Sequence, residues 1–482
     1  MITDLNIPRA VQLVLDDVGW REGWSLDAEG GPWRAGVSRL MHPADYAAIA
    51  DIGAALNMRP QAVMVLCEWD RENVCARCPS CTQSGANWDN RGRIGRWADD
   101  AAHLFRARAA NLELAMHGVG HEYWLGGRRV RAEWYGAQEG LRWPWEDLLE
   151  HLRVFRDILD QHGLGPADGH SLPLSGVPCA FNYYLDDADR HSTGALFREA
   201  QVRYCSTPFG GGFHAHSPLI AADGAVDHGL LVIDRMSSGV PYNVFDTVPA
   251  QLTRNSICGV HWPNILAPDP DDNTAAVGRW VEFLRAVGDQ TDMMLATSSA
   301  ECFSQWVWHT FARVQQSDGE IMLDAGSIPH ELRHVAADGP LWLKFRLKPG
   351  EHVSRVIADG PVAAQYGRTG DHALLGLCGV TPGAHRLRIG TGPEPLRPVV
   401  LRRGTANVLG LEERKGCTRL DLRVCGRQEL HVLMNQSPAG ADSDNTRVRV
   451  LSQHWDPAGG IFTVLLDAGD IQGESAMLYL RL

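Results

Sequence analysis

The feature that most constrains the fold is a change of pattern near residue 320. Before it, short apolar runs alternate with segments of helical periodicity. The apolar runs are VQLVL (11–15), AVMVLC (62–67), LELAM (112–116), PCAFNYY (178–184), VRYCS (202–206), LLVID (230–234), SICGV (256–260) and MMLAT (293–297). Such alternation indicates parallel strands joined by helical crossovers. Seven or eight units of this kind close most naturally into a barrel. We therefore predict an α/β fold, a distorted (β/α)7-8 barrel over residues 1–320, with an open doubly wound sheet as the alternative.

The helical segments between these runs carry their own start signals and apolar spacing. They are expected at HPADYAAIADIGAALNM (42–58), GRWADDAAHLFRARAAN (95–111), about 145–161, STGALFREA (192–200) and about 274–287.

After residue 335 the helical pattern is lost. The chain there consists of short, partly alternating apolar segments separated by Gly, Pro and Asp turns, such as LWLKFRL, HRLRIGTG, TRLDLRV, IFTVLLD and AMLYLRL. This pattern is typical of β-sandwiches. We predict an accessory all-β sandwich region at 335–482, with two small β units as a variant.

Composition excludes several classes of protein. No apolar run approaches the roughly 18 residues that a membrane helix needs. The N-terminus MITDLNIPRA lacks the basic and apolar regions of a signal peptide. A net charge of −13 without a basic stripe argues against a nucleic-acid partner. The odd number of cysteines, 11, fits reduced thiols. We expect a cytoplasmic protein with no membrane partner. Whether Cys75, Cys78 and Cys81 bind a metal stays open.

Acidic and imidazole side chains follow three of the predicted strands directly. Asp16 and Asp17 follow the first strand, His117 and His121 follow the third, and His261 follows the seventh. The C-terminal ends of parallel barrel strands lie at one rim, so these groups are expected to meet there. One carboxylate and two imidazoles are a common catalytic zinc set that leaves a position open for water. The sequence thus predicts a divalent metal, with zinc as the first expectation; alternatively, the aspartates cap the next segment and the histidines form ordinary hydrogen bonds.

These segments resemble a known family. LVLDDVG resembles the Thr-Phe-Asp-Asp-Gly segment of polysaccharide deacetylases with the NodB homology domain, HGVGH resembles their His-x3-His motif, and SICGVHW resembles their late Leu-x-His segment. The resemblance covers roughly residues 10–300 and implies a distorted (β/α)7 barrel. It implies that Asp16 is the catalytic base and His261 the catalytic acid. It also implies that the metal ligands are Asp17, His117 and His121.

The sequence also departs from the family pattern. The family has an Arg-x-Pro-Tyr segment after its fourth strand, whose arginine orients the base, and GVPCAFNYY stands here instead. Gly118 replaces the serine or threonine that usually follows the first metal histidine, and Leu15 replaces the phenylalanine before the aspartates. Related barrels cleave glycosidic bonds at similar metal centres, so this alternative stays open.

Aromatic residues suggest the substrate. Ten of the 16 tryptophans lie in the first 145 residues, several of them in Gly-, Asp- and Arg-rich segments. Tryptophan faces stack on sugar rings, and the predicted substrate-binding residues are Trp20, Trp69, Asp70, Trp88, Trp124 and Trp262. Half of these tryptophans could equally pack loops onto the barrel. If the reaction is glycosidic cleavage, its acid and base should be among the nearby carboxylates, Glu68, Asp70, Glu122 and Glu133.

Taken together, these patterns predict a metal-dependent hydrolase that acts on a carbohydrate. The first expectation is deacetylation of an N- or O-acetylated sugar. A glycoside hydrolase on the same kind of barrel and a non-catalytic carbohydrate-binding protein are the alternatives.

Overall fold

The computed structural model describes residues 2–24, 30–186, 188–216, 219–317 and 319–482, whose contacts divide into two units. The site unit comprises Gln12–Leu284. The β unit comprises Met1–Val11 and Arg285–Leu482. The predicted accessory region 335–482 lies entirely in the β unit, and so does 285–320, the last part of the predicted barrel region.

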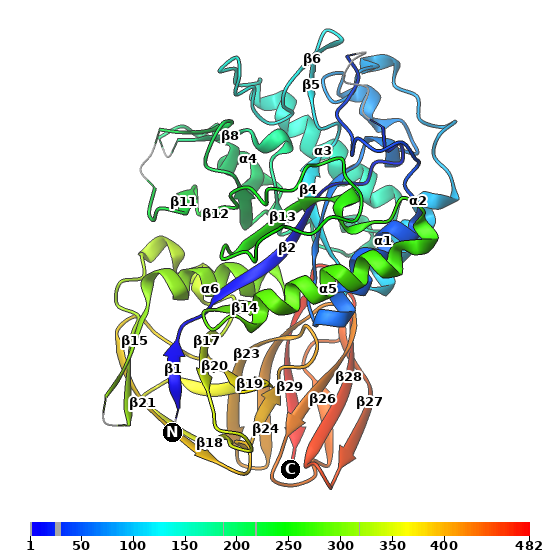
Figure 1. The fold of residues 1–482 in the computed structure, drawn as a ribbon. Coiled ribbons are helices and arrows are strands. Elements are labelled where there is room, and N and C mark those ends of the chain that lie inside the picture. The colour runs from blue at the N-terminus through cyan, green and yellow to red at the C-terminus, as the bar shows by residue number, and fades with distance from the viewer. Residues whose placement is uncertain (1, 25–29, 187, 217–218, 318) are drawn as a thin grey trace. The chain divides into compact units, whose positions relative to one another are not determined.

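The site unit is built on a mainly parallel sheet (Figure 1). Its strands lie in the order β11-β12-β9-β7-β4-β3-β2-β13, and β11 alone pairs in antiparallel fashion. The bounds are β2 Arg9–Val18, β3 Gln61–Val65, β4 Glu113–Gly118, β7 Ser175–Gly176, β9 Tyr204–Thr207, β11 Gly224–Asp227, β12 Leu230–Asp234 and β13 Ile257–His261. Because β2, β3 and β4 are buried along almost their whole length, they read as continuous apolar runs.

Helices follow most of these strands, close to where the sequence predicts them. They are α1 Pro43–Leu56, α2 Arg96–Ala107, α3 Trp145–Gln161, α4 Thr193–Glu199 and α5 Asn273–Asp289. The start of α1 shows why: the His42 side chain accepts from Ala44 N, the Asp45 carboxylate accepts from His42 N, and a proline opens the first turn. Shorter elements fill the loops: β5 Tyr123–Leu125, β6 Arg128–Val130, β8 Tyr183–Leu185 and β10 Phe213–Ala215.

One strand prediction is wrong. The segment 178–184 is not a strand of the main sheet: Cys179–Phe181 forms a 3-10 turn, and β8 begins only at Tyr183 and pairs with β10. The sheet position is filled by β7, just before this segment. Ala180 and Phe181 have φ values of 51° and 61°, which an extended strand cannot contain.

No pairing joins β13 to β11 or β12 among the described residues, so the sheet there is open. The closed barrel therefore stays a prediction. The parallel order still brings the C-terminal ends of β2, β4, β12 and β13 to one edge, and that edge positions the site.

The β unit contains three sheets. The largest has the order β1-β17-β20-β19-β22-β25-β28-β27, and two four-stranded sheets have the orders β15-β16-β21-β18 and β23-β24-β29-β26. The bounds are β1 Thr3–Asn6, β15 Arg313–Ser317, β16 Glu320–Asp324, β17 Leu341–Arg346, β18 His352–Ala358, β19 Val362–Thr369, β20 His372–Cys378, β21 Ala384–Gly392, β22 Val399–Leu401, β23 Asn407–Arg414, β24 Cys417–Val424, β25 Arg427–Leu433, β26 Gly440–Ser443, β27 Val448–Asp456, β28 Ile461–Ala468 and β29 Glu474–Arg481.

A single apolar cluster joins the faces of two of these sheets. It includes Val432 and Val464 from the large sheet and Leu420, Leu478 and Leu480 from the β23–β26 sheet. Along β24 and β28 buried and half-buried residues alternate strictly, which is the period-2 pattern of a strand with one covered face.

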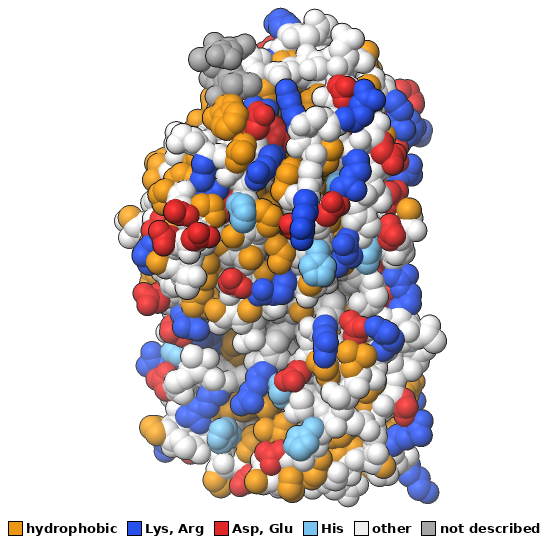
Figure 2. All heavy atoms as spheres, turned by 90° about the vertical axis from the view of Figure 1, so that its right-hand side faces the viewer, with side chains coloured by type: hydrophobic (Ala, Val, Ile, Leu, Met, Phe, Trp, Pro, Cys, Tyr) orange, Lys and Arg blue, Asp and Glu red, His pale blue; other side chains and the backbone are white. Residues whose placement is uncertain are grey.

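The β unit also contains strand β14 (Met293–Leu295) and helices α6 (Ser299–Phe311) and α7 (Arg333–Ala336). None of the described helices, in either unit, is long and apolar enough to cross a membrane. The face drawn in Figure 2 carries acidic and basic side chains side by side, without a continuous patch of one sign.

Candidate metal centre

A bulge in β2 turns two neighbouring carboxylates toward the same end of the sheet. In a regular strand Asp16 and Asp17 would point to opposite faces. The register between β2 and β3 shifts between Leu15 and Val18, and Asp17 has a φ of 61°. Bulges re-aim side chains in this way, and a left-handed aspartate is a strained conformation typical of functional sites. Both aspartates are buried, with 1% and 5% of their surface exposed.

Asp17 lies between the two histidines of the HGVGH segment. Its Oδ1 is 3.6 Å from His117 Nε2 and 3.6 Å from His121 Nε2. This oxygen is buried and has no hydrogen-bond partner among the described residues. Three potential ligands from two strand ends thus surround one point.

The other ring nitrogen of each histidine is engaged. His117 Nδ1 is 2.8 Å from the carbonyl oxygen of Val177, and His121 Nδ1 is 2.6 Å from Glu122 Oε1. Both contacts place the ring proton on Nδ1, which leaves the Nε2 lone pair directed at Asp17. Metal-binding histidines are oriented by partners of this kind.

Glu133 holds the loop that carries His121. Its carboxylate accepts hydrogen bonds from the backbone N–H groups of Val119, Gly120 and His121, at 2.9 to 3.0 Å. It also contacts His151 Nδ1 at 2.9 Å. The space next to Gly118 is filled by Glu133, because a Cβ there would lie 2.2 Å from Glu133 Oε2. The serine or threonine of the family motif therefore does not fit here.

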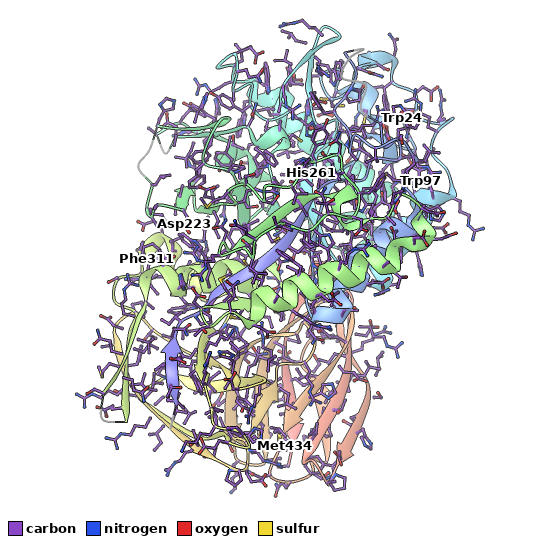
Figure 3. The ribbon with its side chains drawn as sticks, in the orientation of Figure 1. Trp24, Trp97, Asp223, His261, Phe311 and Met434 are labelled. Carbon is purple, nitrogen blue, oxygen red and sulfur yellow. The ribbon has the colours of Figure 1, made fainter. Side chains whose placement is uncertain are left out.

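His261 lies near the other carboxylate oxygen of Asp17. Its Nε2 is 3.8 Å from Asp17 Oδ2, and the register of β13 against β2 pairs His261 with Asp16 (Figure 3 labels His261 at the end of β13). Its ring meets Phe181 and Tyr242 edge-on. Burial lowers the pKa of His261 more than the nearby Asp17 raises it.

Asp16 is clamped by an arginine that the sequence reasoning missed. Arg235 Nη1 donates to Asp16 Oδ1 at 2.9 Å, and Nη2 lies 2.7 Å from Oδ2 as an ion-pair contact. Arg235 directly follows β12, at the same sheet edge, and its strand-end position was the signal that could have revealed it. The guanidinium fits because Gly259 has no side chain: a Cβ there would lie 2.0 Å from Arg235 Nη2.

The electrostatics of the cluster favour a charged carboxylate. Burial alone would raise the pKa of Asp17, but the contact with His117 and the charges of His121 and His261 hold that pKa well below its usual range. Burial alone would lower the pKa of His117, and Asp17 outweighs this effect, so the pKa of His117 lies above its ordinary value. Without a cation, an anionic Asp17 therefore needs protons on its histidine neighbours.

A cavity of about 450 Å³ opens next to these groups. Its polar lining includes Asp17, His117, His121 and His261, and most of its exposed lining is apolar. The aromatic members are Trp33, Phe181 and Tyr242, with the Trp33 and Tyr242 rings edge-to-face at 6.2 Å. Arg34, Arg131, Gln138 and Ala180 complete the lining.

These residues fit a divalent cation. Asp17 supplies a buried, unpartnered oxygen, and two oriented imidazole nitrogens face it. Cys179 is a second candidate for the third ligand, because ligand atoms of His117, His121 and Cys179 lie within 4.8 Å of one another. However, Cys179 Sγ donates to the carbonyl of His117 at 3.2 Å, and burial raises the pKa of its thiol well above the ordinary value. Asp17 is the better ligand, since metals bind the thiolate and not the thiol.

The predicted substrate-binding residues do not lie at this cavity. Trp20, Trp69, Asp70, Trp88, Trp124 and Trp262 are all buried, with at most 8% of their surface exposed. Trp69 Nε1 donates to the carbonyl of Gly19, and Asp70 accepts from Trp88 Nε1. These contacts join loops. They agree with the alternative interpretation, in which the tryptophans pack loops and do not stack on a sugar. The aromatic residues at the cavity are Trp33, Phe181 and Tyr242 instead.

The carboxylates considered for glycosidic cleavage are engaged elsewhere. Glu68 contacts Arg34 at 2.8 Å, Glu122 holds His121, and Glu133 holds the HGVGH loop. Asp70 accepts from two backbone N–H groups, those of Val74 and Cys75. None of the four lines the cavity.

Cys75, Cys78 and Cys81 are buried side by side. Burial raises the pKa of the Cys75 thiol to about 12. Among the described residues, His117, His121 and Cys179 form a group whose ligand atoms lie close enough together for a metal ion. None of the three clustered cysteines belongs to that group.

A scan of protein-family models finds no match to the chain, and a search of curated proteins finds no similar sequence.

Proposed function

We propose that the chain is a metal-dependent hydrolase that removes an acyl group from a carbohydrate, as a divergent relative of polysaccharide deacetylases. The observation that carries the proposal is the buried Asp17 Oδ1, which has no hydrogen-bond partner among the described residues and lies 3.6 Å from two histidine Nε2 atoms. A carboxylate desolvated in this way is stable only with a cationic partner.

Asp17, His117 and His121 would hold the cation, and the partners on both histidine Nδ1 atoms support that assignment. A bound divalent ion supplies Lewis-acid activation of water and of the acyl oxygen.

The chain's own groups supply the proton transfers. Asp16 accepts a proton from the attacking water, and Arg235 fixes the direction of its carboxylate through two contacts. His261, near the other carboxylate oxygen of Asp17, delivers a proton to the departing oxygen or nitrogen of the sugar.

The cavity supports a sugar as the bound group. Trp33, Phe181 and Tyr242 offer aromatic surface beside the cluster, and aromatic faces are suited to the apolar faces of sugar rings. Acyl removal is favoured over glycosidic cleavage because Glu68, Glu122 and Glu133 are already engaged, so that beyond Asp16 and Asp17 the described residues supply no further carboxylate at the cavity.

The test combines metal content with product analysis. We expect about one divalent ion per chain, lost in Asp17→Asn and His117→Ala and retained in Asp16→Asn and Cys179→Ser. Asp16→Asn should lower acetate release by at least about 100-fold, since it removes the base and leaves the ligands in place.

Substrates for this test are acetylated oligosaccharides, with acetate and new reducing ends followed together. Acetate without reducing ends supports the proposal. Reducing ends without acetate would replace it with glycosidic cleavage, and tight sugar binding without either product would replace it with a binding protein. Full metal occupancy in both Asp17→Asn and His117→Ala would overturn the ligand assignment.

A further inference from the structure

The guanidinium of Arg131, at the cavity, has no acidic partner among the described residues. Arg131 lines the cavity, is half-buried, and lies over the Trp33 ring with 4.6 Å between its Cζ and the ring centroid. No hydrogen bond or ion pair of its side chain to the described residues is present. Stacking on an indole fixes a guanidinium in position but leaves its N–H donors free. Arg131 therefore presents a positive charge, which no described side chain pairs, to whatever occupies the cavity.

A second arginine at the same cavity has an unused donor. Arg34 is 3% exposed, and it contacts Glu68 through Nε and Nη2 and Glu22 through Nη2. Its Nη1 is buried and has no hydrogen-bond partner among the described residues. A buried N–H group without an acceptor is rare in folded proteins, and an acceptor on a ligand is one way to satisfy it.

From these two arginines we infer that the carbohydrate bound here carries an acidic group, a carboxylate or a sulfate, which Arg131 recognises. The inference rests on the proposed function for the identity of the ligand as a carbohydrate. Guanidinium groups bind such anions through two parallel N–H donors, and Arg34, whose Nη1 has no acceptor among the described residues, lines the same cavity.

Net charge does not produce this preference. The chain has a formal charge of −13, which repels anions at long range, and physiological salt screens that repulsion beyond about 8 Å. Selection for an acidic sugar must therefore come from groups inside the cavity. Arg131 is the residue there whose charge no described side chain offsets.

The experiment compares ligands that differ only in charge. Binding of methyl glucuronoside, methyl glucoside 6-sulfate and neutral methyl glucoside to the purified full-length protein is measured by calorimetry at two salt concentrations. Acetate release is measured separately on acetylated oligomers of glucuronic acid and of glucose. The variants are Arg131→Gln and the matched control Arg128→Gln, an exposed arginine on the adjacent strand β6 that does not line the cavity.

We expect at least one acidic ligand to bind about tenfold or more tightly than the neutral one, and Arg131→Gln to remove most of that difference. Arg128→Gln should keep it. The affinities of the carboxylate ligand and of the sulfate ligand, compared with each other, show which of the two acidic groups the cavity binds more tightly. Equal binding of all three ligands, or a preference that survives Arg131→Gln, overturns the inference, even if acetate is released. A preference that depends on Arg131 without any acetate release overturns the proposed function and leaves the recognition of charge standing.

Discussion

Among single residues, the site depends on missing side chains as much as on charged ones. Arg235 can reach Asp16 only because Gly259 has no side chain, and the guanidinium occupies the space where a Cβ would lie. The sequence predicted the strand that contains Gly259 but gave no reason to connect it with Arg235, because these residues belong to different strands and meet only in the folded sheet.

Gly259→Ala should therefore impair Asp16, the proposed base, without touching the proposed metal ligands. The new methyl group would lie 2.0 Å from Arg235 Nη2, so the guanidinium must move away from Asp16. We expect acetate release to fall by about tenfold or more, with unchanged metal content. Gly278→Ala is the control, because a Cβ at that exposed position of α5 meets nothing within 4 Å. Equal activity of the two variants would contradict the role of Arg235.

His151 gives the site unit a dependence on pH. Burial by itself lowers the pKa of this histidine, but its contacts with Cys78 and Glu133 outweigh burial and raise the pKa from 6.5 to about 10. The folded state therefore binds the proton more tightly than the unfolded state does. Its contribution to stability is complete below about pH 6.5 and is lost as the pH rises toward about 10.

We expect the free energy of unfolding to decrease between pH 7 and pH 9.5, and His151→Gln to show a weaker decrease over this range. Urea unfolding followed by tryptophan fluorescence at several pH values measures both slopes. Parallel curves for the wild type and the variant would rule out this histidine as the source.

Among the elements, the HGVGH loop shows how much local sequence can indicate. His117 and His121 could be predicted as metal ligands because they follow a strand and are spaced for one ion. The structure brings both of them near Asp17. The tryptophans could not be assigned, since burial depends on the whole fold: Trp69 is fully buried, whereas Trp33 lines the cavity.

The same loop allows a test of the support that Glu133 gives. In Gly118→Ala the added Cβ would lie 2.2 Å from Glu133 Oε2 and 2.8 Å from Cys179 Sγ. Glu133 must then release some of the backbone N–H groups that fix His121. We expect metal affinity to fall by about 10- to 100-fold, as measured by competition with a chelator. An unchanged affinity would mean that His121 does not depend on this carboxylate.

At the scale of the whole molecule, the sequence predicted the change to all-β structure but not the division into units. The last part of the predicted barrel region, with helix α6, belongs to the β unit by its contacts. A buried ion pair explains part of this: Glu301 on α6 contacts Arg402 at 2.7 Å and accepts from Trp342 Nε1 at 2.8 Å. Such pairings join residues that are far apart in the chain and leave no local signal.

Arg402→Met should destabilise the β unit by about 3 to 5 kcal/mol, because it leaves the 1% exposed Glu301 without its cation. Although burial by itself raises the pKa of Glu301, Arg402 holds it below its ordinary value, so the charge persists. Arg414→Met, at an exposed pair with Glu412, should change stability much less, because water and salt screen surface ion pairs. Thermal unfolding measures both, and comparable losses would show that burial does not matter at Glu301.

The order of the units along the chain also has a consequence for biosynthesis. The site unit is one continuous stretch, 12–284, inserted between the two segments of the β unit. Strand β1 pairs with β17, with Thr3 opposite Arg346, so β1, which is made before the site unit, waits for a partner that emerges after that unit. The site unit meets no such delay, and domains generally fold as they emerge during synthesis. The residues that gather around Asp17 can thus reach their places while the first strand is still unpaired.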